Sequence, residues 1–197
     1  MIVIISGPSG VGKGTLVRAL RAADTSIAID LSVSVTTRKP RPTELEGVDY
    51  HFIDEDTFFQ KVKNHEFLEW CEVHQNFYGT PKQPVLDAME SGNPIILEID
   101  IQGAQKIKNT MGKSVVSIFL TPPSFEDLIE RLHRRNTEQP EVIQHRLLMA
   151  GAELSAIGDY DYIVVNHDIE QMTRDVMEIL HDRCREGSQK KALGGPS

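Results

Sequence analysis

Residues 2–15 read IVIISGPSGVGKGT, and the rest of the fold can be worked out from this segment. It opens with four β-branched residues, a pattern typical of a strand buried on both faces of a parallel sheet. A glycine-rich turn follows, and from residue 15 to residue 22 the apolar residues recur at helical spacing. Such a unit is the setting of a phosphate-binding loop, in which backbone N–H groups surround phosphate oxygens and a lysine, here Lys13, neutralises them. The predicted contacts with nucleotide phosphates are Gly7, Pro8, Ser9, Gly10, Val11, Gly12, Lys13, Gly14 and Thr15.

The loop departs from the usual pattern at one position. The residue after the lysine is normally Ser or Thr and binds magnesium, but here it is Gly14, with a hydroxyl one place later at Thr15. Gly14 weakens direct binding of magnesium by the loop but not the binding of phosphate. We therefore expect Mg²⁺ to enter as MgATP, held mainly by nucleotide oxygens and water. The plain alternative is a glycine-rich turn that only joins a strand to a helix, and Lys13 at this spacing argues against it.

Strand-like and helix-like patterns alternate along the rest of the chain. Further apolar runs predict buried core strands at residues 94–100, 115–120 and 162–166. Amphipathic patterns predict helices at residues 82–91, 124–135, 140–157 and 169–185. Strands that alternate with helices indicate an α/β fold with a largely parallel sheet.

Residues 32–79 break this rhythm. Short alternating segments at 48–52 and 67–73 accompany a helix-like piece near 56–64. This mixture predicts a small, partly antiparallel subdomain inserted between the first and second core strands. The end of the chain, residues 187–197, is rich in Gly, Ser and Lys and is predicted to be disordered.

Composition narrows the classes of function. The chain has 197 residues, of which 40% are hydrophobic and 25% charged, as is ordinary for one globular domain. Its formal net charge of −8 argues against binding to nucleic acid or to an anionic membrane. No apolar run approaches the about 20 residues needed to cross a bilayer, and the first residues do not read as a signal peptide. Cys71 and Cys184 show no metal or redox spacing, so we expect a cytoplasmic protein with both thiols unbridged.

Four ordered motifs follow the phosphate loop. They are SVTTRKPRP at residues 34–42, GVDYHF at 47–52, EFLEW at 66–70 and NFYGT at 76–80. Each motif alone is weak, but as an ordered set they are specific, and with them the chain resembles the guanylate kinase family up to about residue 184. The resemblance implies a P-loop NTPase three-layer α/β fold with a parallel core sheet, an inserted small GMP-binding subdomain and a helical lid.

The same resemblance divides the chain into parts. A single domain is expected at residues 1–186, followed by the tail. Its core comprises residues 1–31, 82–123 and 152–186, its GMP-binding subdomain residues 32–81 and its lid residues 124–151.

The resemblance assigns the acceptor phosphate to two arginines and two tyrosines. A nucleoside monophosphate is a dianion, which suits the planar, permanently charged guanidinium groups of Arg38 and Arg41. Tyr50 and Tyr78 can add phenolic donors to the same phosphate. Arg41 is also expected to take part in catalysis. Taken alone, the two arginines could equally be solvated charges in a proline-containing loop.

The guanine base is assigned to Glu69, Ser34 and Thr80. Guanine presents N1–H and an N2 amino group as neighbouring donors, which a carboxylate accepts, and its O6 can accept from the two hydroxyls. Adenine has an acceptor at N1 and would leave the buried carboxylate unpaired, which is costly. A lone glutamate on a strand is more often an exposed charge, so the assignment of Glu69 depends on the family motif.

Glu98 and Asp100 end the second core strand, where open α/β sheets bind their ligands. The family usually has an aspartate at the position of Glu98. We assign both residues to the acceptor nucleotide and to hydrated magnesium. The alternative is that they are structural carboxylates that hold the acceptor-site arginines.

The segment RLHRRNTE at residues 131–138, followed by Arg146, resembles the mobile lid of the family. Phosphoryl transfer to an anionic oxygen requires positioning, exclusion of water and nearby cations, but no general base. Arg131 is expected to contact ATP, and the plain alternative for the segment is a helix with a solvated basic face. The expected catalytic residues are Lys13, Arg41, Arg135 and Arg146.

Asn166 and His167 follow the last core strand, and the resemblance places them at the adenine or ribose end of ATP. The family often has an acidic residue at the position of His167, so the prediction is carried over mainly onto Asn166.

Taken together, the motifs predict an active guanylate kinase that transfers the γ-phosphate of ATP to GMP. A guanylate-kinase-like interaction module of a scaffold protein would share the fold, but such modules typically lose parts of the phosphate loop, which this chain keeps. Adenylate kinase shares the sequence Gly-Lys-Gly-Thr, but the insert at residues 34–80 favours guanine. The expected partners are ATP and GMP, with no nucleic acid and no membrane, and the expected assembly is a monomer or a weak homodimer.

Overall fold

The computed structural model describes residues 1–23, 27–73, 75–134 and 140–193, without the side chains of residues 134, 140–146 and 187–193. Its centre is a parallel five-stranded sheet with the strand order β2-β7-β1-β8-β9. The strands are β1 (Ile2–Ser6), β2 (Asp30–Ser32), β7 (Ile95–Glu98), β8 (Val115–Thr121) and β9 (Tyr162–Val165). Strands β7 and β8 lie on opposite sides of β1. The carboxyl end of β1 is therefore a topological switch point, and open sheets of this kind bind their ligands there.

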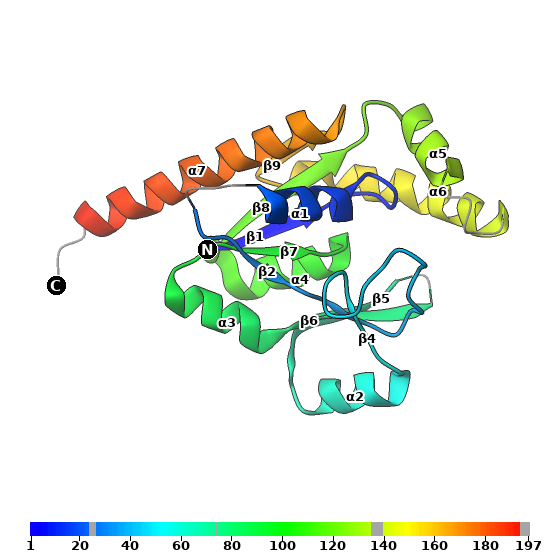
Figure 1. Ribbon diagram of the computed structural model, residues 1–197, viewed down its shortest axis with the longest axis horizontal. Helices are drawn as coiled ribbons and strands as arrows, with labels where there is room; N and C mark the ends of the chain where they lie inside the picture. The colour runs from blue at the N-terminus through cyan, green and yellow to red at the C-terminus, as the bar shows by residue number, and fades with distance from the viewer. Residues whose placement is uncertain (24–26, 74, 135–139, 194–197) are drawn as a thin grey trace.

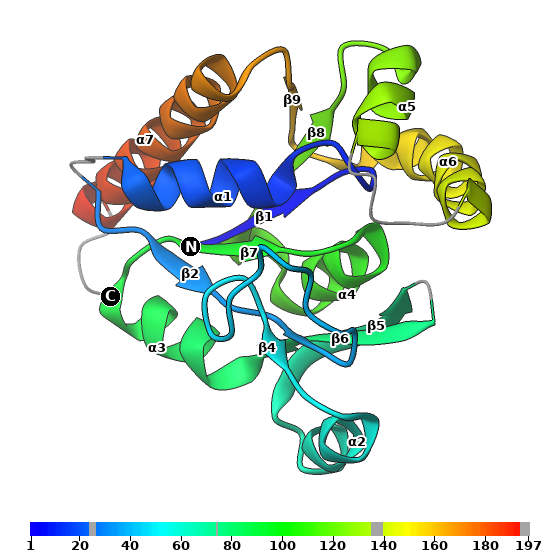
Figure 2. The same cartoon turned by 45° about the vertical axis from the view of Figure 1, so that its right-hand side comes forward.

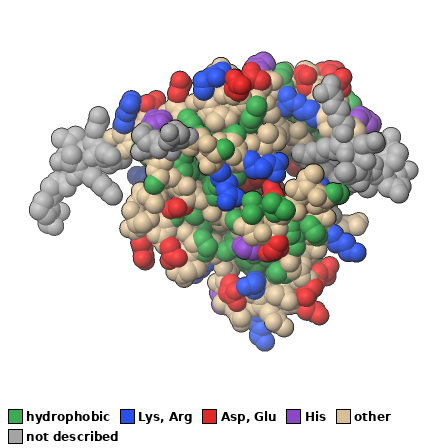
Figure 3. All heavy atoms as spheres, viewed as in Figure 1, with side chains coloured by type: hydrophobic (Ala, Val, Ile, Leu, Met, Phe, Trp, Pro, Cys, Tyr) green, Lys and Arg blue, Asp and Glu red, His purple; other side chains and the backbone are tan. Residues whose placement is uncertain are grey.

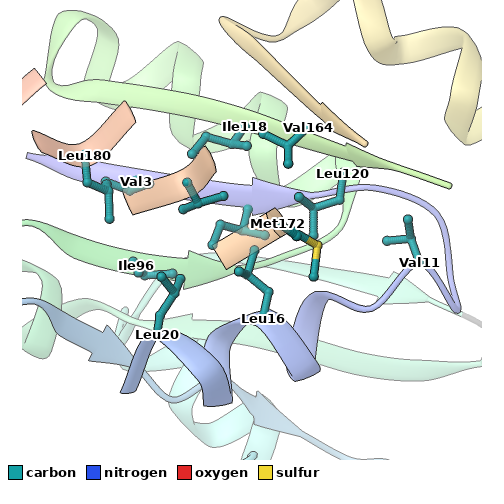
Figure 4. Close-up of a cluster of buried hydrophobic side chains, with 12 residues drawn as sticks. Val3, Val11, Leu16, Leu20, Ile96, Ile118, Leu120, Val164, Met172 and Leu180 are labelled. Carbon is teal, nitrogen blue, oxygen red and sulfur yellow. The ribbon is translucent and has the colours of Figure 1, made fainter. Parts of the chain in front are cut away.

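Alternate side chains of β1 enter two separate hydrophobic cores. Val3 and Ile5 pack with α1 (Lys13–Ala22) and α7 (Ile169–Leu193), whereas Ile2 and Ile4 pack with α3 (Lys82–Ser91) and α4 (Ile101–Met111). All four side chains are fully buried, as is typical of a parallel strand with helices on both faces. Figure 1 shows the three layers, and Figure 4 shows the core between the sheet and helices α1 and α7. The predicted three-layer α/β fold is therefore confirmed.

A second, smaller sheet has the strand order β4-β3-β6-β5. Its strands are β3 (Val35–Thr36), β4 (His51–Phe52), β5 (Phe67–Val73) and β6 (Asn76–Pro81). Strand β6 pairs antiparallel with β3 and β5, and β3 pairs parallel with β4, so the partly antiparallel pairing predicted here is confirmed. Helix α2 (Glu55–Lys63) covers this sheet through Phe58, whose ring centroid lies 4.8 Å from that of Phe67 and 5.7 Å from that of Phe77.

Helices α5 (Phe125–Arg134) and α6 (Pro140–Ser155) stand together at one end of the main sheet (Figure 2). They share a small core formed by Leu128, Leu132 and Ala150. Short 3₁₀ turns, Gly112–Ser114 and Ala156–Asp159, lead into β8 and β9. Within the described residues, no helix combines the length and the apolar character needed to cross a membrane.

The structure differs from the sequence-based expectations in three elements. Strand β2 and helix α4 were not predicted. Strand β2 is too short to show a periodic pattern, and α4 begins so soon after β7 that one apolar run covers both elements. The residues of α4 that enter the core, Ala104 and Ile107, do have helical spacing. Helix α7 continues to Leu193, where the sequence predicted disorder from residue 187. Gly187 costs a helix only about 1 kcal/mol relative to Ala, and the residues after it up to Leu193 are compatible with a helix.

Candidate active site

The phosphate loop connects β1 to α1. Gly7 and Gly12 have φ values of 142° and 107°, and a Cβ on Gly7 would lie 2.3 Å from the carbonyl oxygen of Leu120, so only glycine fits there. In α1, every residue of which is described, there is no side-chain N-cap and no acidic residue in the first turn. The positive end of this helix therefore points into the loop without a side chain to balance it.

Two side chains already interact with the polar backbone of the loop. Lys13 Nζ donates hydrogen bonds to the carbonyl oxygens of Gly7, at 2.7 Å, and Pro8, at 3.2 Å. The N–H of Ser9 donates to a carboxylate oxygen of Glu153, on α6, at 3.3 Å. A negatively charged oxygen therefore lies against the loop backbone, which is the environment that suits a phosphate.

Asn166 and Arg131 hold the phosphate loop through hydrogen bonds to backbone carbonyl oxygens. Asn166 Nδ2 donates to the carbonyl oxygen of Val11 at 2.6 Å, and Arg131 donates to the carbonyl oxygens of Asn166, at 2.8 Å, and Val11, at 3.4 Å. A Cβ on Gly12 would lie 2.6 Å from Asn166 Nδ2, so this packing also requires a glycine. His167, the other residue predicted at this end, is exposed.

The loop opens into a cavity of about 600 Å³ lined by residues of both sheets. Figure 3 shows basic side chains gathered around a hollow near the middle of the molecule. The predicted site residues that line the cavity are Gly7, Ser9, Gly10, Gly12, Lys13, Gly14, Thr15, Ser34, Arg38, Arg41, Tyr50, Glu69, Tyr78, Glu98 and Asp100. The structure thus brings the donor and acceptor halves of the predicted site together around one space.

Glu44 holds the two acceptor-site arginines. Its carboxylate accepts two hydrogen bonds from the Arg38 guanidinium, at 2.8 and 3.0 Å, one from Arg41 Nη1 at 3.2 Å and one from Arg41 N at 2.8 Å. Burial alone would raise the pKa of Glu44, but these bonds outweigh it and lower the pKa. Arg38 also donates to the Tyr78 hydroxyl at 3.2 Å and lies 5.5 Å from the centre of the Tyr50 ring. The four predicted phosphate ligands therefore form one cluster, ordered by an acid that the sequence motifs did not identify.

Glu69 is a buried acid with one satisfied oxygen. It is 7% exposed, and its Oε1 accepts a hydrogen bond of 2.7 Å from the Thr80 hydroxyl. Its Oε2 is buried and has no hydrogen-bond partner among the described residues. The pKa of Glu69 is raised to about 7, mainly by burial and also by the charge of Asp100, while the hydrogen bond from Thr80 and the charge of Lys106 limit the rise. A buried oxygen of this kind normally has a partner, so the arrangement favours a ligand that brings hydrogen-bond donors.

Ser34, Cys71 and Asp100 line the same cavity as Glu69. Ser34 is buried, and Cys71 Sγ donates to Asp100 Oδ1 at 3.4 Å. The same oxygen accepts a 2.8 Å hydrogen bond from the N–H of Gly103, so Asp100 is the N-cap of α4. Asp100 therefore has a structural role as well as a place in the cavity lining.

Glu98, the last residue of β7, lines the cavity and lies close to the first turn of α1. Its Oε2 is 3.5 Å from the position that a Cβ on Gly14 would occupy. The carboxylate therefore faces the position at which the loop lacks its usual hydroxyl. Glu44 binds both acceptor-site arginines, and the roles of Glu98 and Asp100 stay predictions.

An ion pair joins two segments that line the cavity. Arg18, on α1, donates to Asp49 Oδ1 at 2.7 Å, and Arg21, one helical turn later, donates to the carbonyl oxygen of Val48 at 3.4 Å. Asp49 in turn accepts from the N–H of Leu45 at 2.9 Å. Helix α1 thus contacts the loop that precedes β4, and its first turn belongs to the phosphate loop.

Two of the predicted lid arginines have no described side chain. Arg135 lies outside the described residues, and Arg146 belongs to α6 but its side chain is not described. Their catalytic roles therefore stay predictions.

Several residues of the site were not identified from the sequence. For Glu44 and Glu153 the only signal in the sequence was their negative charge. A carboxylate near a predicted anion site suggests a partner for the cations of that site. Arg18 and Asp49 became partners only through the folding of distant segments.

Comparisons with known proteins identify the family of this chain. A family model described as guanylate kinase matches residues 1–183. A guanylate kinase from Streptomyces kasugaensis is 46% identical over 179 residues, covering 91% of this chain and 86% of the relative. One from Agrobacterium fabrum (strain C58) is 47% identical over 180 residues, covering 91% of this chain and 81% of the relative. A crystal structure of guanylate kinase from Anaplasma phagocytophilum matches with a TM-score of 0.74 and 38% identity, covering 94% of this chain and 88% of that one. Since the family model spans nearly the whole chain, the protein belongs to the guanylate kinase family.

Proposed function

We propose that the protein transfers the γ-phosphate of ATP to GMP, giving ADP and GDP, as a nucleoside monophosphate kinase. The observation that supports this best is the buried Glu69, whose Oε2 has no partner among the described residues and whose side chain lines the same cavity as Lys13 and Arg38. A donor-rich base, a monophosphate and a polyphosphate can each find complementary groups around this one space.

The donor side positions the leaving group. The N–H groups of the phosphate loop and the N-terminus of α1 bind the β- and γ-phosphates of ATP. The ammonium group of Lys13 exchanges its bonds to the loop carbonyl oxygens for bonds to these phosphates. Charge that develops on the bridging oxygen during transfer is then balanced by the loop and Lys13.

The acceptor side positions the attacking oxygen. Arg38 and Arg41 hold the GMP phosphate, with hydrogen bonds from Tyr50 and Tyr78, and Glu44 fixes both guanidinium groups in advance. An anionic oxygen of GMP forms a bond to the γ-phosphorus while the bond from that phosphorus to the bridging oxygen breaks, and ADP leaves. No proton has to move before attack, so orientation and charge account for the catalysis.

The residues around Gly14 fit a hydrated magnesium ion better than a directly bound one. Thr15 is exposed, and Glu98 places a hard carboxylate opposite Gly14, which suits Mg²⁺ that keeps several waters. Glu98, with Asp100 at the same edge, would hold the ion through water. When bound, Mg²⁺ neutralises charge on the transferring phosphate.

The base side selects guanine. The ionised Glu69 accepts the N1–H and N2–H of guanine, and Ser34 donates to O6. Thr80 was expected to donate to O6, but its single hydroxyl hydrogen is donated to Glu69 Oε1, so Thr80 serves the base by holding this carboxylate. Adenine would place its N1 lone pair against the carboxylate, and the buried charge would be left without a donor.

The remaining assignments belong to the same proposal. Arg135 and Arg146 surround the transferring phosphate, while Arg131 and Asn166 hold the ATP side of the loop. The proposed domain consists of the core, the GMP-binding subdomain at residues 32–81 and the lid at residues 124–151. The proposed assembly is a monomer or a weak homodimer. Because Cys71 and Cys184 are thiols without a disulfide, we place the protein in the cytoplasm.

A coupled assay of ADP release tests the function directly. The full chain is supplied with ATP and magnesium, and with GMP, AMP, UMP or CMP separately. We expect turnover with GMP and little with the other three. A folded protein that turns over none of them would overturn the enzyme and support the binding-module alternative.

GMP binding is expected to release protons near neutral pH. Guanine donors bind only the ionised Glu69, so binding lowers a pKa that stands at about 7 in the unliganded pocket. As pH falls below 7, the ionised fraction falls by up to tenfold for each pH unit, and the affinity for GMP falls with it. Asp100, Cys71 and Lys106 are the other titratable groups acting on this carboxyl. Calorimetry at pH 7 in two buffers of different ionisation enthalpy measures the protons released.

The phosphate of GMP also titrates, with a second pKa near 6, so a control is needed. The variant Glu69→Gln keeps the phosphate titration and lacks that of the carboxyl. Equal proton release from the two proteins at pH 7 would contradict the role of Glu69.

A further inference from the structure

Gly103 lies directly behind the Glu69 carboxylate, in the first turn of α4. Its N–H donates to Asp100 Oδ1 at 2.8 Å, and Gly103 is itself buried. The first turn of α4 therefore packs against the carboxylate of Glu69, a residue that lines the cavity.

A side chain at position 103 would collide with Glu69. A Cβ there would lie 2.8 Å from Glu69 Oε2, 3.0 Å from Glu69 Cδ and 3.2 Å from Asp100 Oδ1. Carbon and other heavy atoms pack at about 3.5–4.0 Å, so the carboxylate of Glu69 would have to move.

Backbone conformation does not explain this glycine. Gly103 is inside α4 and is not among the glycines with positive φ in the described chain. Glycine is also one of the least favourable residues for a helix, and Ala the most favourable. The space beside Glu69 is therefore the feature of this position that requires the absence of a side chain.

We propose that Gly103 is a positioning residue for guanine recognition. Thr80 holds Glu69 Oε1 from one side, and Gly103 leaves room for Oε2 on the other, so that the carboxylate presents both oxygens in the orientation that the base requires. A methyl group at position 103 moves the carboxylate out of this orientation. Since the side chain of Glu69 is flexible, the fold can accommodate the shift. The substitution therefore weakens GMP binding and does not disrupt the fold. This inference rests on the proposed function.

The variant Gly103→Ala tests the proposal in the full chain. We expect the KM for GMP to rise by about tenfold or more, because small misplacements of a binding group are costly, while kcat and the KM for ATP stay within about twofold. Gly158→Ala is the matched control, since no atom lies within 4 Å of a Cβ at that position and its φ is not positive, and it should leave all three constants unchanged. An unchanged KM for GMP in Gly103→Ala, or an equal loss for ATP, would overturn the proposal.

A double-mutant cycle with Glu69→Ala separates positioning from a general structural role. Without the Glu69 carboxylate, a methyl group at position 103 still meets Asp100 Oδ1, at 3.2 Å, but no longer displaces Glu69, and it gains helix propensity. We therefore expect it to raise the melting temperature more in the Glu69→Ala background than in the wild type. An identical change in both backgrounds would overturn the proposal, even where GMP binding is too weak to measure. A wild-type protein inactive toward GMP would instead overturn the proposed function, so the two failures are distinguishable.

Discussion

Replacing Lys13 by Met is expected to lower kcat with ATP and GMP by about 10³-fold, a typical cost of removing a charge-stabilising group from a transition state. Methionine has a similar length and no charge, so the loop loses the cation that otherwise bonds to Gly7 and Pro8 and, in the proposed mechanism, moves to the phosphates. The binding of GMP, which depends on Arg38 and Glu69, should change little. Steady-state kinetics with GMP saturating, together with GMP calorimetry, would measure both quantities.

Lys113→Met is the matched control, because Lys113 is an exposed lysine of the 3₁₀ turn before β8. It removes the same charge from the whole molecule and should retain full activity. A Lys13 variant with a kcat near that of the wild type would show that the loop does not act on the transferring phosphate.

The second large effect is expected from Glu69→Gln, which should lower kcat/KM for GMP by about 10³-fold. An amide can accept only one of the two donors of guanine and turns its own N–H groups toward the other, and an unpaired buried donor is costly. The same amide can donate to N1 of adenine, so the preference for GMP over AMP should narrow. Measuring kcat/KM for both nucleotides gives the change in preference directly.

The same substitution is expected to stabilise the protein without nucleotide. Burial raises the pKa of Glu69 from its ordinary 4.5 to about 7, so the folded state loses stability as pH rises from 4.5 through 7 and regains it when the acid is neutral. At about 1.4 kcal/mol per pH unit, the ionised acid costs on the order of 3 kcal/mol above pH 7. Thermal unfolding at pH 8 should show a higher melting temperature for Glu69→Gln, with a smaller difference at pH 5.

Glu72→Gln provides the comparison on the same strand, since Glu72 is exposed on β5. It should change neither the melting temperature nor the kinetics. If both glutamine variants behaved alike, the buried charge of Glu69 would have no special part in recognition.

The sequence predicts well those features whose chemistry is contained in consecutive residues. The phosphate loop is one, because its glycines and Lys13 follow one another between a strand and a helix. The core strands are another, since an uninterrupted apolar run is typical of a strand with helices on both faces. For Glu69 and Tyr78, however, the pattern alone was uninformative, and the family resemblance supplied the assignment.

The features that sequence could not supply depend on distances between segments far apart in the chain. In the sequence, Gly103 is only a residue that is unfavourable in a helix. Its role can be inferred only when the position of the Glu69 carboxylate beside it is known. Glu44 reads as one surface acid among many until the loop brings it against Arg38 and Arg41. Asn166 was expected at the nucleotide, and its contact with the carbonyl oxygen of Val11 follows from the packing of β9 beside the loop.

The ion pair between Arg18 and Asp49 bears on how quickly substrates can enter and leave. The Arg18 side chain is 56% exposed, and an exposed pair of this kind contributes only about 0.2–1 kcal/mol, close to the thermal energy of about 0.6 kcal/mol. Breaking this ion pair alone therefore costs about as much as thermal motion supplies, while Arg21 keeps its separate bond to the carbonyl oxygen of Val48. This ion pair by itself is therefore too weak to delay nucleotide exchange.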